Sequence, residues 1–593
     1  MVEHAFQVDL RGVVDLLSRH LYTGPRVYVR ELLQNAVDAI AARRLVEPDA
    51  PAAVDVVAGE VLEVHDSGIG LTEDEVHELL ATIGRSSKRD DFGFARHEFL
   101  GQFGIGLLSC FLVADQVRVT TRSARGGQTV VWTGFADGRY TVTSADGERA
   151  RRGTTVTLAP RRGMEHWLGA QVVTELATAF GSLLPVPVTV NGRAVNEDEP
   201  PWQRRYGTSH DRTAALSAYG ESLFGFTPFD VIDLRVPAAG LSGVAFVLPM
   251  AANPAERGGH RVYLRRMLLA EDVPDLLPEW AFFVRCVVDT SELRPTAGRE
   301  ALYADDLLAD TREAIGAQLR DWLVAMSGTQ PRRLQRFLQV HHLGVKALAV
   351  HDDAMLRVVD RWWPMETNLG PRTLAEFRRT HPTVRYTATA AEFRELAAVA
   401  AAQGIGLVNG GYTYDIEIMK RVPELDPAVQ VRYLEPADLT TTFAPPDPVA
   451  AQRLRPFVAL AEDLLAGRCA VVPRTFDPPA VPALYLVSRA AVQAGEMAAA
   501  RESADDLWSG VLAAVDGPAP ADDRPQLVLN LANPLVRRIA ELPDATLTGL
   551  GVQALYGQAL LQGHHPLHTE DSAVLNQALL GLLDWTVRPG EGA

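Results

Sequence analysis

Residues 25–42, PRVYVRELLQNAVDAIAA, decide how the first part of the chain folds. Their spacing predicts a helix with Pro25 in its first turn, where proline is favoured, and with Thr23 and Gly24 as candidate caps. At roughly 100° per residue, one side of this helix is apolar. We expect that side to face a core, and its residues are Val29, Leu33, Ala36 and Ile40.

The opposite side of the predicted helix is polar. Glu31, Asn35 and Asp38 fall within about 60° of one another on it. Two interpretations are open: a solvated surface, which is the commoner case, or two carboxylates and an amide that line a binding site. The segments that follow favour the binding site.

Residues 54–72, VDVVAGEVLEVHDSGIGLT, predict two strands separated by a glycine turn. The second strand ends at Asp66, and Gly68 and Gly70 follow it. Glycines let a backbone come close to a flat ligand, and a carboxylate can accept a hydrogen bond from an exocyclic amine. Alone the pattern is weak evidence, because glycine turns after strands are common.

A glycine-rich loop follows a charged helix expected from Glu73 to Leu80. The loop, residues 101–106 (GQFGIG), opens a predicted apolar helix. Glycines before a helix N-terminus present free N–H groups and the positive end of the dipole, which suits phosphate. Close helix packing is the structural alternative, and the spacing matches neither the Walker nor the Rossmann pattern. We expect residues 83–100 to form a lid over a ligand.

Three later segments predict strands of an antiparallel sheet. They are VRVTTRS (117–123), TVVWTG (129–134) and RRGTTVTLAP (151–160), with Gly153 and Thr154 at the start of the last one.

Composition limits the classes of protein that fit. At 593 residues the chain is too long for one core, and a length prior suggests about three to five domains. The net charge of −17 is spread along the chain without a Lys/Arg-rich block, which argues against nucleic acid as the main partner. The three cysteines have no CxxC spacing, which disfavours a disulfide framework or a structural zinc site. The N-terminus lacks a signal-peptide pattern and no apolar run reaches the length of a membrane span, so we expect a cytoplasmic protein.

Four of these motifs, in this order, resemble the nucleotide site of the Bergerat-fold (GHKL) ATPases. This superfamily includes gyrase B, MutL, histidine kinases and the heat-shock protein 90 chaperones. The longer phrases LYTGPRVYVRELLQNAVDA (21–39) and GQFGIGLLSCFLVADQVRV (101–119) are similar to the bacterial HtpG-type chaperones in particular. The four motifs are ELLQNAVDA (31–39), DSGIG (66–70), GQFGIG (101–106) and GTTVTL (153–158).

The resemblance implies a site for ATP and Mg²⁺. Glu31 would be the general base that acts on the attacking water, and Asn35 would supply an oxygen to Mg²⁺. Asp66 would accept the adenine amine, with Thr154 assisting through water. The other residues expected to contact nucleotide are Asp38, Gly68, Gly70, Arg85, Gly101, Gln102, Phe103, Gly104, Ile105 and Gly106.

Two parts of this site depart from the family pattern. Leu79 stands where an asparagine is usual, and IGRSSKR (83–89) only loosely resembles the usual lid segment, with Arg85 in place of a lysine.

Residues 193–214 are polar, contain Pro-Pro and predict a linker. The segment beyond it, residues 262–303, resembles the chaperones' middle domain. That match implies that Arg299 reaches the γ-phosphate as an arginine finger. Taken alone Arg299 reads as a surface arginine, and Tyr303 replaces the glutamine that is usual four residues after it.

The last part of the chain, beyond FAPPDP (443–448), resembles the chaperones' C-terminal dimerisation domain. Two apolar helices are predicted, over residues 551–563 and 571–586. Such a helix is usually core, but in this family it pairs with its symmetry mate. The tail WTVRPGEGA lacks the acidic peptide that recruits TPR cochaperones. The apolar surface of the last helix is formed by Leu575, Leu579, Leu580, Leu582 and Leu583.

We therefore predict an α+β multidomain protein with an N-terminal Bergerat-fold ATPase domain (1–200), an α/β middle domain (215–445) and a C-terminal dimerisation domain (448–593). The function implied is that of an ATP-driven, homodimeric chaperone that binds non-native client proteins, as in a stress response, without nucleic acid or membrane as partner. The alternative is a nucleotide-binding regulatory protein with little or no ATP turnover. A MutL- or gyrase-type enzyme is disfavoured by the net charge, and a histidine kinase by the lack of a preceding phosphoacceptor helix domain.

Overall fold

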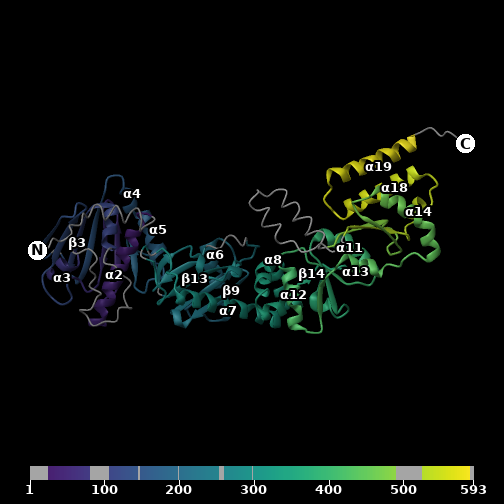
Figure 1. Ribbon diagram of the computed structural model, residues 1–593. Helices are drawn as coiled ribbons and strands as arrows, with labels where there is room; N and C mark the ends of the chain where they lie inside the picture. Colours follow the sequence, from purple (N-terminus) through teal and green to yellow (C-terminus); the bar gives the residue numbers. More distant parts are fainter. Residues whose placement is uncertain are drawn as a thin grey trace, which may run out of the picture. The chain divides into compact units, whose positions relative to one another are not determined.

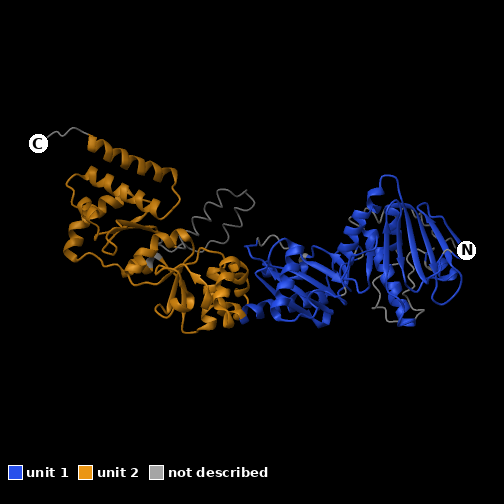
Figure 2. Ribbon diagram, turned by 180° about the vertical axis from the view of Figure 1, so that it is seen from behind, with its two compact units in different colours: residues 1–325 blue, residues 326–593 orange. Residues whose placement is uncertain are grey.

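The protein forms two compact units, residues 1–325 and 326–593, coloured separately in Figure 2. The computed structural model describes residues 24–80, 106–144, 147, 149–197, 199–252, 259–296, 298, 300–488 and 524–587. None of the helices in these ranges has the length and apolar character that crossing a membrane requires.

The first unit begins with an eight-stranded sheet in the order β5-β4-β3-β6-β2-β1-β7-β8. All neighbouring strands pair antiparallel except β1 and β7, which pair parallel. The three predicted antiparallel strands are therefore confirmed as β3, β4 and β6, whereas β5 was not predicted. The strands are β1 (Val54–Ala58), β2 (Leu62–Asp66), β3 (Ala114–Arg122), β4 (Val130–Phe135), β5 (Tyr140–Ser144), β6 (Gly153–Pro160), β7 (Val188–Val190) and β8 (Arg193–Ala194).

Helices α2 and α5 cover one face of this sheet, where they contact each other and the central strands (Figure 1). Residues of β1 and β2 alternate between buried and more exposed positions, as expected for a sheet with one packed face. The predicted apolar side of α2 is confirmed as core. The helical segments of this part are α2 (Val27–Val46), α3 (Glu73–Leu79), the 3₁₀ helix η1 (Gly106–Leu112), α4 (Glu165–Leu168) and α5 (Ala170–Gly181).

The predicted ends of α2 were wrong. The helix begins at Val27 with Arg26 at the N-cap position and no side-chain cap, while the carbonyl of Pro25 accepts from the Tyr28 amide. It continues to Val46, beyond the predicted end, because Arg43 and Arg44 in its last turn suit the negative end of the helix dipole. The helix stops at Glu47, whose φ of −125° and ψ of 86° are not helical, since the helical region is disfavoured for a residue before proline.

A second, five-stranded sheet follows in the first unit, in the order β12-β11-β13-β10-β9. The segment HRVYLRRML (260–268), predicted as one strand, is instead the hairpin β11–β12, which turns at Arg265 and Arg266 with φ of 50° and 69°. An Arg-Arg pair is not the usual sequence of such a turn, which explains why the hairpin was not predicted. The elements are α6 (Ser209–Phe224), β9 (Asp230–Val236), η2 (Pro237–Ala239), β10 (Leu241–Val247), β11 (Arg261–Leu264), β12 (Met267–Ala270), η3 (Pro274–Leu276), η4 (Glu279–Ala281), β13 (Val284–Thr290) and α7 (Asp306–Thr329).

The segment predicted as a linker, residues 193–214, is packed in part. It contributes β8 and the first turns of α6, and Trp202 within it is buried and donates its Nε1–H to the Ser242 hydroxyl at 3.3 Å. The first-sheet and second-sheet residues share one apolar cluster, which includes Phe180 of α5 and Met267 of β12. This shared core explains why residues 1–325 form one compact unit, and the division into three domains stays a prediction.

The second unit contains a three-stranded parallel sheet, β17-β16-β18, and a three-stranded mixed sheet, β19-β21-β20. Its helices are α8 (Pro331–Ala349), α9 (Asp353–Trp362), α10 (Leu374–Phe377), α11 (Ala390–Ala402), α12 (Asp415–Leu425), α13 (Pro436–Thr442), α14 (Pro448–Leu464), α17 (Pro534–Ala540), α18 (Ala545–Gln562) and α19 (Thr569–Val587). Its strands are β14 (Pro364–Met365), β15 (Arg372–Thr373), β16 (Thr383–Thr387), β17 (Leu407–Asn409), β18 (Gln430–Tyr433), β19 (Ala470–Arg474), β20 (Ala483–Leu486) and β21 (Gln526–Asn530).

One apolar cluster of the second unit joins these two sheets across the predicted boundary near residue 445. It includes Phe393 and Leu396 of α11 together with Leu484 of β20. Phe443, the first residue of the FAPPDP segment, stacks on Phe476 beyond it, with ring centroids 4.4 Å apart. The Pro-rich segment therefore runs beside a continuous core.

The side chain of Glu395 of α11 is only 7% exposed. Its carboxylate lies 3.7 Å from Nε2 of His565, which itself is 3.0 Å from the Tyr485 carbonyl. Burial, and then the charge of Glu392, raise the pKa of Glu395 to about 8, against a smaller opposing effect of a backbone hydrogen bond from Tyr485. Burial therefore favours the protonated form of Glu395.

We predict that Glu395→Gln makes stability less sensitive to pH. Because the folded-state pKa lies above the unfolded one, the native protein binds more protons, and wild-type stability falls as the pH rises from about 4.5 to 8. The variant should match the wild type at pH 5 and exceed it at pH 8.5, by a free energy of unfolding on the order of 1–3 kcal/mol. Thermal unfolding at both pH values measures this, with the exposed Glu541→Gln as control. An equal difference at both pH values would contradict the prediction.

Candidate functional site

The loop after β2 packs directly on α2. The Ile69 amide donates to the Ala39 carbonyl at 2.9 Å, and a Cβ at Gly68 would lie 2.5 Å from the Cβ of Ala39. Only a residue without a side chain fits there, so Gly68 fixes the distance between the loop and the helix. The helix and the loop therefore act as one element.

The other end of the loop packs on β3. Gly70 has φ of +65°, and a Cβ there would lie 2.2 Å from the Arg122 carbonyl oxygen. The Ile69 carbonyl accepts from the Ala124 amide at 2.7 Å. These contacts explain both glycines by close packing, and their predicted role of admitting a flat ring stays a prediction.

Asp66, at the end of β2, carries a buried carboxylate. Both hydrogen bonds described for it end on Oδ1, from the Gly68 amide at 2.7 Å and the Thr154 amide at 3.2 Å. Burial raises its pKa to about 6, while these hydrogen bonds and the charges of Arg149 and Arg43 act in the opposite direction. Asp66 is thus a buried acceptor whose charged form is favoured by its hydrogen bonds and by the two arginines, and a carboxylate can accept from an amine.

Thr154 is placed beside Asp66 by strand register. Strands β2 and β6 pair antiparallel with His65 opposite Thr155, so the start of β6 lies at the end of β2. The Thr154 hydroxyl lies 3.1 Å from that of Thr121 on β3, which also accepts from the Leu71 amide at 2.9 Å. The structure thus brings together the sequence motifs around Asp66 and Thr154.

The polar side of α2 is not a solvated surface. Glu31 and Asp38 are each only 5% exposed, whereas Asn35 between them is exposed. Two buried carboxylates on one helix carry a desolvation cost that a purely structural helix avoids. Their burial therefore supports the interpretation as a site.

Glu31 lies against the start of η1. A Cβ at Gly106 would lie 2.5 Å from Oε2 of Glu31, so this glycine lets the backbone reach the carboxylate. Arg30 forms an ion pair with Glu31 at 3.4 Å and donates to the Gly298 carbonyl at 3.2 Å. The predicted apolar helix after GQFGIG is a 3₁₀ helix from Gly106 to Leu112.

The predicted phosphate loop, Gly101, Gln102, Phe103, Gly104 and Ile105, lies outside the described residues, as do the lid with Arg85 and the side chain of Arg299.

The described residues around position 299 form the base of a narrow loop. The Thr296 amide donates to the Ala301 carbonyl at 2.9 Å and the Tyr303 amide to the Arg294 carbonyl at 2.7 Å. The ring of Tyr303 lies 5.4 Å from the Arg294 guanidinium carbon. Tyr303, where the family has glutamine, thus packs on the base of the loop.

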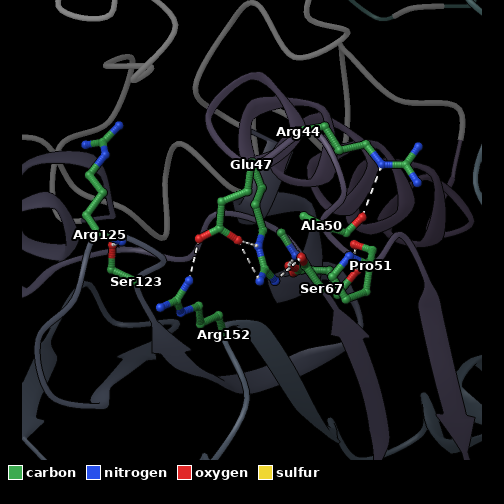
Figure 3. A network of polar contacts seen from close by, with 11 residues as sticks. Arg44, Glu47, Ala50, Pro51, Ser67, Ser123, Arg125 and Arg152 are labelled. Carbon is green, nitrogen blue, oxygen red and sulfur yellow. Dashed lines mark hydrogen bonds and ion pairs between the residues drawn. The ribbon is translucent and has the colours of Figure 1, made fainter.

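Sequence reasoning missed a set of arginines around the Asp66 loop. Figure 3 shows Glu47, at the end of α2, with the Arg152 guanidinium beside it. Arg43 also pairs with Glu47, at 3.1 Å, and Arg149 contacts the Asp66 carbonyl. The sequence signal for these arginines is the basic run at 149–152, which is unusual in an acidic chain.

Comparison with known proteins fits this geometry. Residues 22–146 match the family described as histidine kinase-, DNA gyrase B- and HSP90-like ATPase. The Chaperone protein HtpG of Chlorobium chlorochromatii is 26% identical over 366 residues, which cover 56% of this chain and 57% of that protein. The chain is similar to the HtpG chaperones of the heat-shock protein 90 family over these residues. The sequence resemblance is thereby confirmed.

Other HtpG proteins give the same picture. Those of Methylobacterium sp. strain 4-46 and Methylobacterium nodulans are 30% and 31% identical, over 53% of this chain and 55% and 56% of their own lengths. The chain therefore matches little more than half of the length of these HtpG proteins.

The donor set near α2 fits a weakly held hard cation better than a protein-caged metal. Among the described residues no group of three or more His, Cys, Asp or Glu side chains could hold a metal ion. Mg²⁺ usually takes one or two protein oxygens and completes its shell with water and phosphate. The exposed amide of Asn35 could supply one such protein oxygen.

We predict that Asp66→Asn weakens ADP binding by about 100-fold or more, because it replaces a charged acceptor by a neutral amide at a buried contact. Isothermal titration calorimetry at pH 7.5 measures the loss. Asp55→Asn, an exposed carboxylate on the neighbouring strand β1, is the matched control and should bind normally. Near-normal binding by Asp66→Asn would show that the adenine contact is misplaced.

Proposed function

We propose that this protein is an ATP-hydrolysing chaperone of the HtpG type. The observation that carries the proposal is the packing of the Asp66 loop on α2, which puts a buried carboxylate acceptor beside a helix that carries two further buried carboxylates and an exposed amide. This arrangement lies within the part of the chain that matches the ATPase family. We place the action of the protein in the cytoplasm, as the sequence leads us to expect.

Recognition of the base would fall to Asp66 and Thr154. Both hydrogen bonds described for Asp66 end on Oδ1, so Oδ2 would accept from the adenine amine. Phosphates would be bound by residues 101–106 and Arg85, as expected from the sequence. Asn35 would hold Mg²⁺ and its waters, and Asp38, one turn later, would contact the nucleotide. When bound, Mg²⁺ supplies neutralisation of phosphate charge.

Glu31 would act as general base toward the attacking water. Its carboxylate is buried, is held by Arg30 and lies against the backbone at Gly106. These contacts leave it few rotamers, and a base held in position is what phosphoryl transfer needs, since positioning and charge supply most of the catalysis.

Arg299 would complete the site from the narrow loop at 294–303. Arg30 touches both Glu31 and the Gly298 carbonyl, so the residue next to Arg299 is tied to the neighbour of the general base. This contact supports the proposal that the loop senses the nucleotide site.

The C-terminal helix α19 supports the proposed homodimer. Leu580 and Leu583 are 65% and 52% exposed, and Leu579, Trp585 and Val587 are exposed as well. Leu579, Leu580, Leu583 and Val587 fall within about 100° of one another on the helix, and an exposed apolar face of this kind is typical of an interface. We propose that it pairs with a second copy, and that further apolar surface binds non-native clients.

We predict that Glu31→Ala binds ADP as the wild type does yet hydrolyses ATP at least about 100-fold more slowly, because the base is lost while the contacts to adenine remain. Arg299→Ala should behave in the same way. Steady-state phosphate release, with binding measured separately, tests this.

The control for Glu31→Ala is Glu60→Ala, an exposed carboxylate in the turn between β1 and β2, which should turn over normally. If the wild type binds nucleotide but shows no turnover, the protein is a nucleotide-gated binding module, which is the alternative function.

We predict that the double variant Leu580→Asp/Leu583→Asp is monomeric, because charges on an apolar interface would be desolvated without partners. Sedimentation velocity measures the change, and Val449→Asp, an exposed residue at the start of α14, is the control. A variant that stays dimeric would refute the assignment of α19 as the dimer helix.

A further inference from the structure

Two arginines hold two consecutive carbonyls of the Asp66 loop. Nη2 of Arg149 donates to the carbonyl of Asp66 at 2.7 Å, and Nη1 of Arg43 donates to the carbonyl of Ser67 at 2.8 Å. Arg43 comes from α2 and Arg149 from the segment before β6, so the loop is held from both sides. We call Arg43 and Arg149 the arginine clamp.

The guanidinium of Arg149 is fixed in orientation. Its Nε donates to the Arg151 carbonyl at 3.1 Å, and its Nη1 contacts the Thr155 hydroxyl. Gly153, with φ of +119°, makes room for it, since a Cβ there would lie 2.2 Å from the Asp66 carbonyl oxygen and 3.0 Å from Nη2 of Arg149. All three guanidinium nitrogens of Arg149 therefore make a polar contact. The close approach of this side chain also explains why the GTTVTL motif begins with a glycine.

The two arginines of the clamp differ in whether a carboxylate pairs with them. Arg43 is ion-paired with Glu47, which also receives Arg152 (Figure 3). The contacts described for Arg149 are two carbonyls and a hydroxyl. No ion pair of Arg149 with a carboxylate is described, and among the described groups Asp66 is the acid whose charge acts on it.

Asp66 needs such a charge. Its side chain is buried and its described donors are neutral backbone amides. Burial raises its pKa to about 6, and the largest charge that acts against this is that of Arg149, followed by Arg43. Burial also lowers the pKa of Arg149, with the charge of Asp66 opposing this effect. The two groups thus stabilise each other's charged forms.

We propose that Arg149 is a positioning residue for nucleotide recognition: it holds the Asp66 loop and keeps the Asp66 carboxylate charged, so that adenine is bound at neutral and mildly acidic pH. This inference rests on the proposed function. The GTTVTL motif assigns no role to Arg149, which lies four residues before the first residue of the motif, Gly153.

The test is the pH dependence of ADP·Mg²⁺ affinity between pH 5.5 and 8.5 for the wild type, Arg149→Met and Arg149→Lys. Removal of a cation beside a carboxylate raises the carboxyl pKa by about one unit. Arg149→Met should then bind ADP about 5-fold more weakly than the wild type at pH 6 and within about 2-fold at pH 8. Arg149→Lys, which keeps the charge, should recover most of the difference.

Two control variants separate this effect from others. Arg151→Met removes an exposed arginine of the same segment and should leave the pH profile unchanged. His65 lies 2.9 Å from the Thr155 hydroxyl, and histidines in general change charge between pH 5 and 8, so His65→Phe should also keep the wild-type midpoint. At each pH the ADP affinity of the variant is divided by that of the wild type, and this ratio removes the effect of the titration of the nucleotide itself.

The outcomes distinguish this inference from the proposed function. If the wild type fails to bind ADP at every pH, the proposed function is wrong and the inference falls with it. If the wild type binds and the loss in Arg149→Met is the same at all pH values, or absent, Arg149 is a structural residue and the inference alone is overturned. Should Arg149→Met fail to fold, Arg149→Gln is the second neutral variant for the same comparison.

Discussion

The structure of the first unit depends on a buried carboxylate that is satisfied by backbone. Asp66 accepts from the amides of Gly68 and Thr154, one from its own loop and one from a strand far away in sequence. An unpaired buried charge would be costly, so the ends of β2 and β6 must stay in register and the loop must stay on α2. Glycines at 68, 70 and 153 allow these approaches, and each occupies a place where a Cβ would collide with backbone or side chain.

The same constraint links recognition to catalysis. Helix α2 carries Glu31 and Asp38, and the Asp66 loop bonds to the same helix at Ala39. A shift of the loop would therefore move the helix, and one rigid body carries both the proposed adenine acceptor and the proposed base. Such a scaffold holds its reacting groups better than separate loops would. The arginine clamp adds positive charge to this rigid body. It does so beside the Asp66 loop and the last turn of α2, whereas Glu31 lies near the start of that helix.

Shared apolar cores, and not polar proline-rich segments, decide which parts of the chain form one compact unit. Composition suggested boundaries at the Pro-Pro segment near 200 and at FAPPDP, and both are polar and proline-rich. In the structure apolar clusters pass beside both, through Phe180 and Met267 in the first unit and through Phe393 and Leu484 in the second. A linker sequence therefore marks where the chain can turn, but only the apolar contacts decide which segments form one compact unit.

The sequence by itself determined the site motifs, most of the strands of the first sheet and the apolar side of α2, because these follow from local spacing and from glycine placement. It did not determine the ends of α2, the hairpin at Arg265–Arg266 or the strand β5, whose signals are weak or unusual. Tertiary structure alone decided that Glu31 and Asp38 are buried and that Arg43 and Arg149 meet at the Asp66 loop. Burial and charge depend on what packs across from a residue, and partners 24 and 83 positions apart leave no trace in local periodicity.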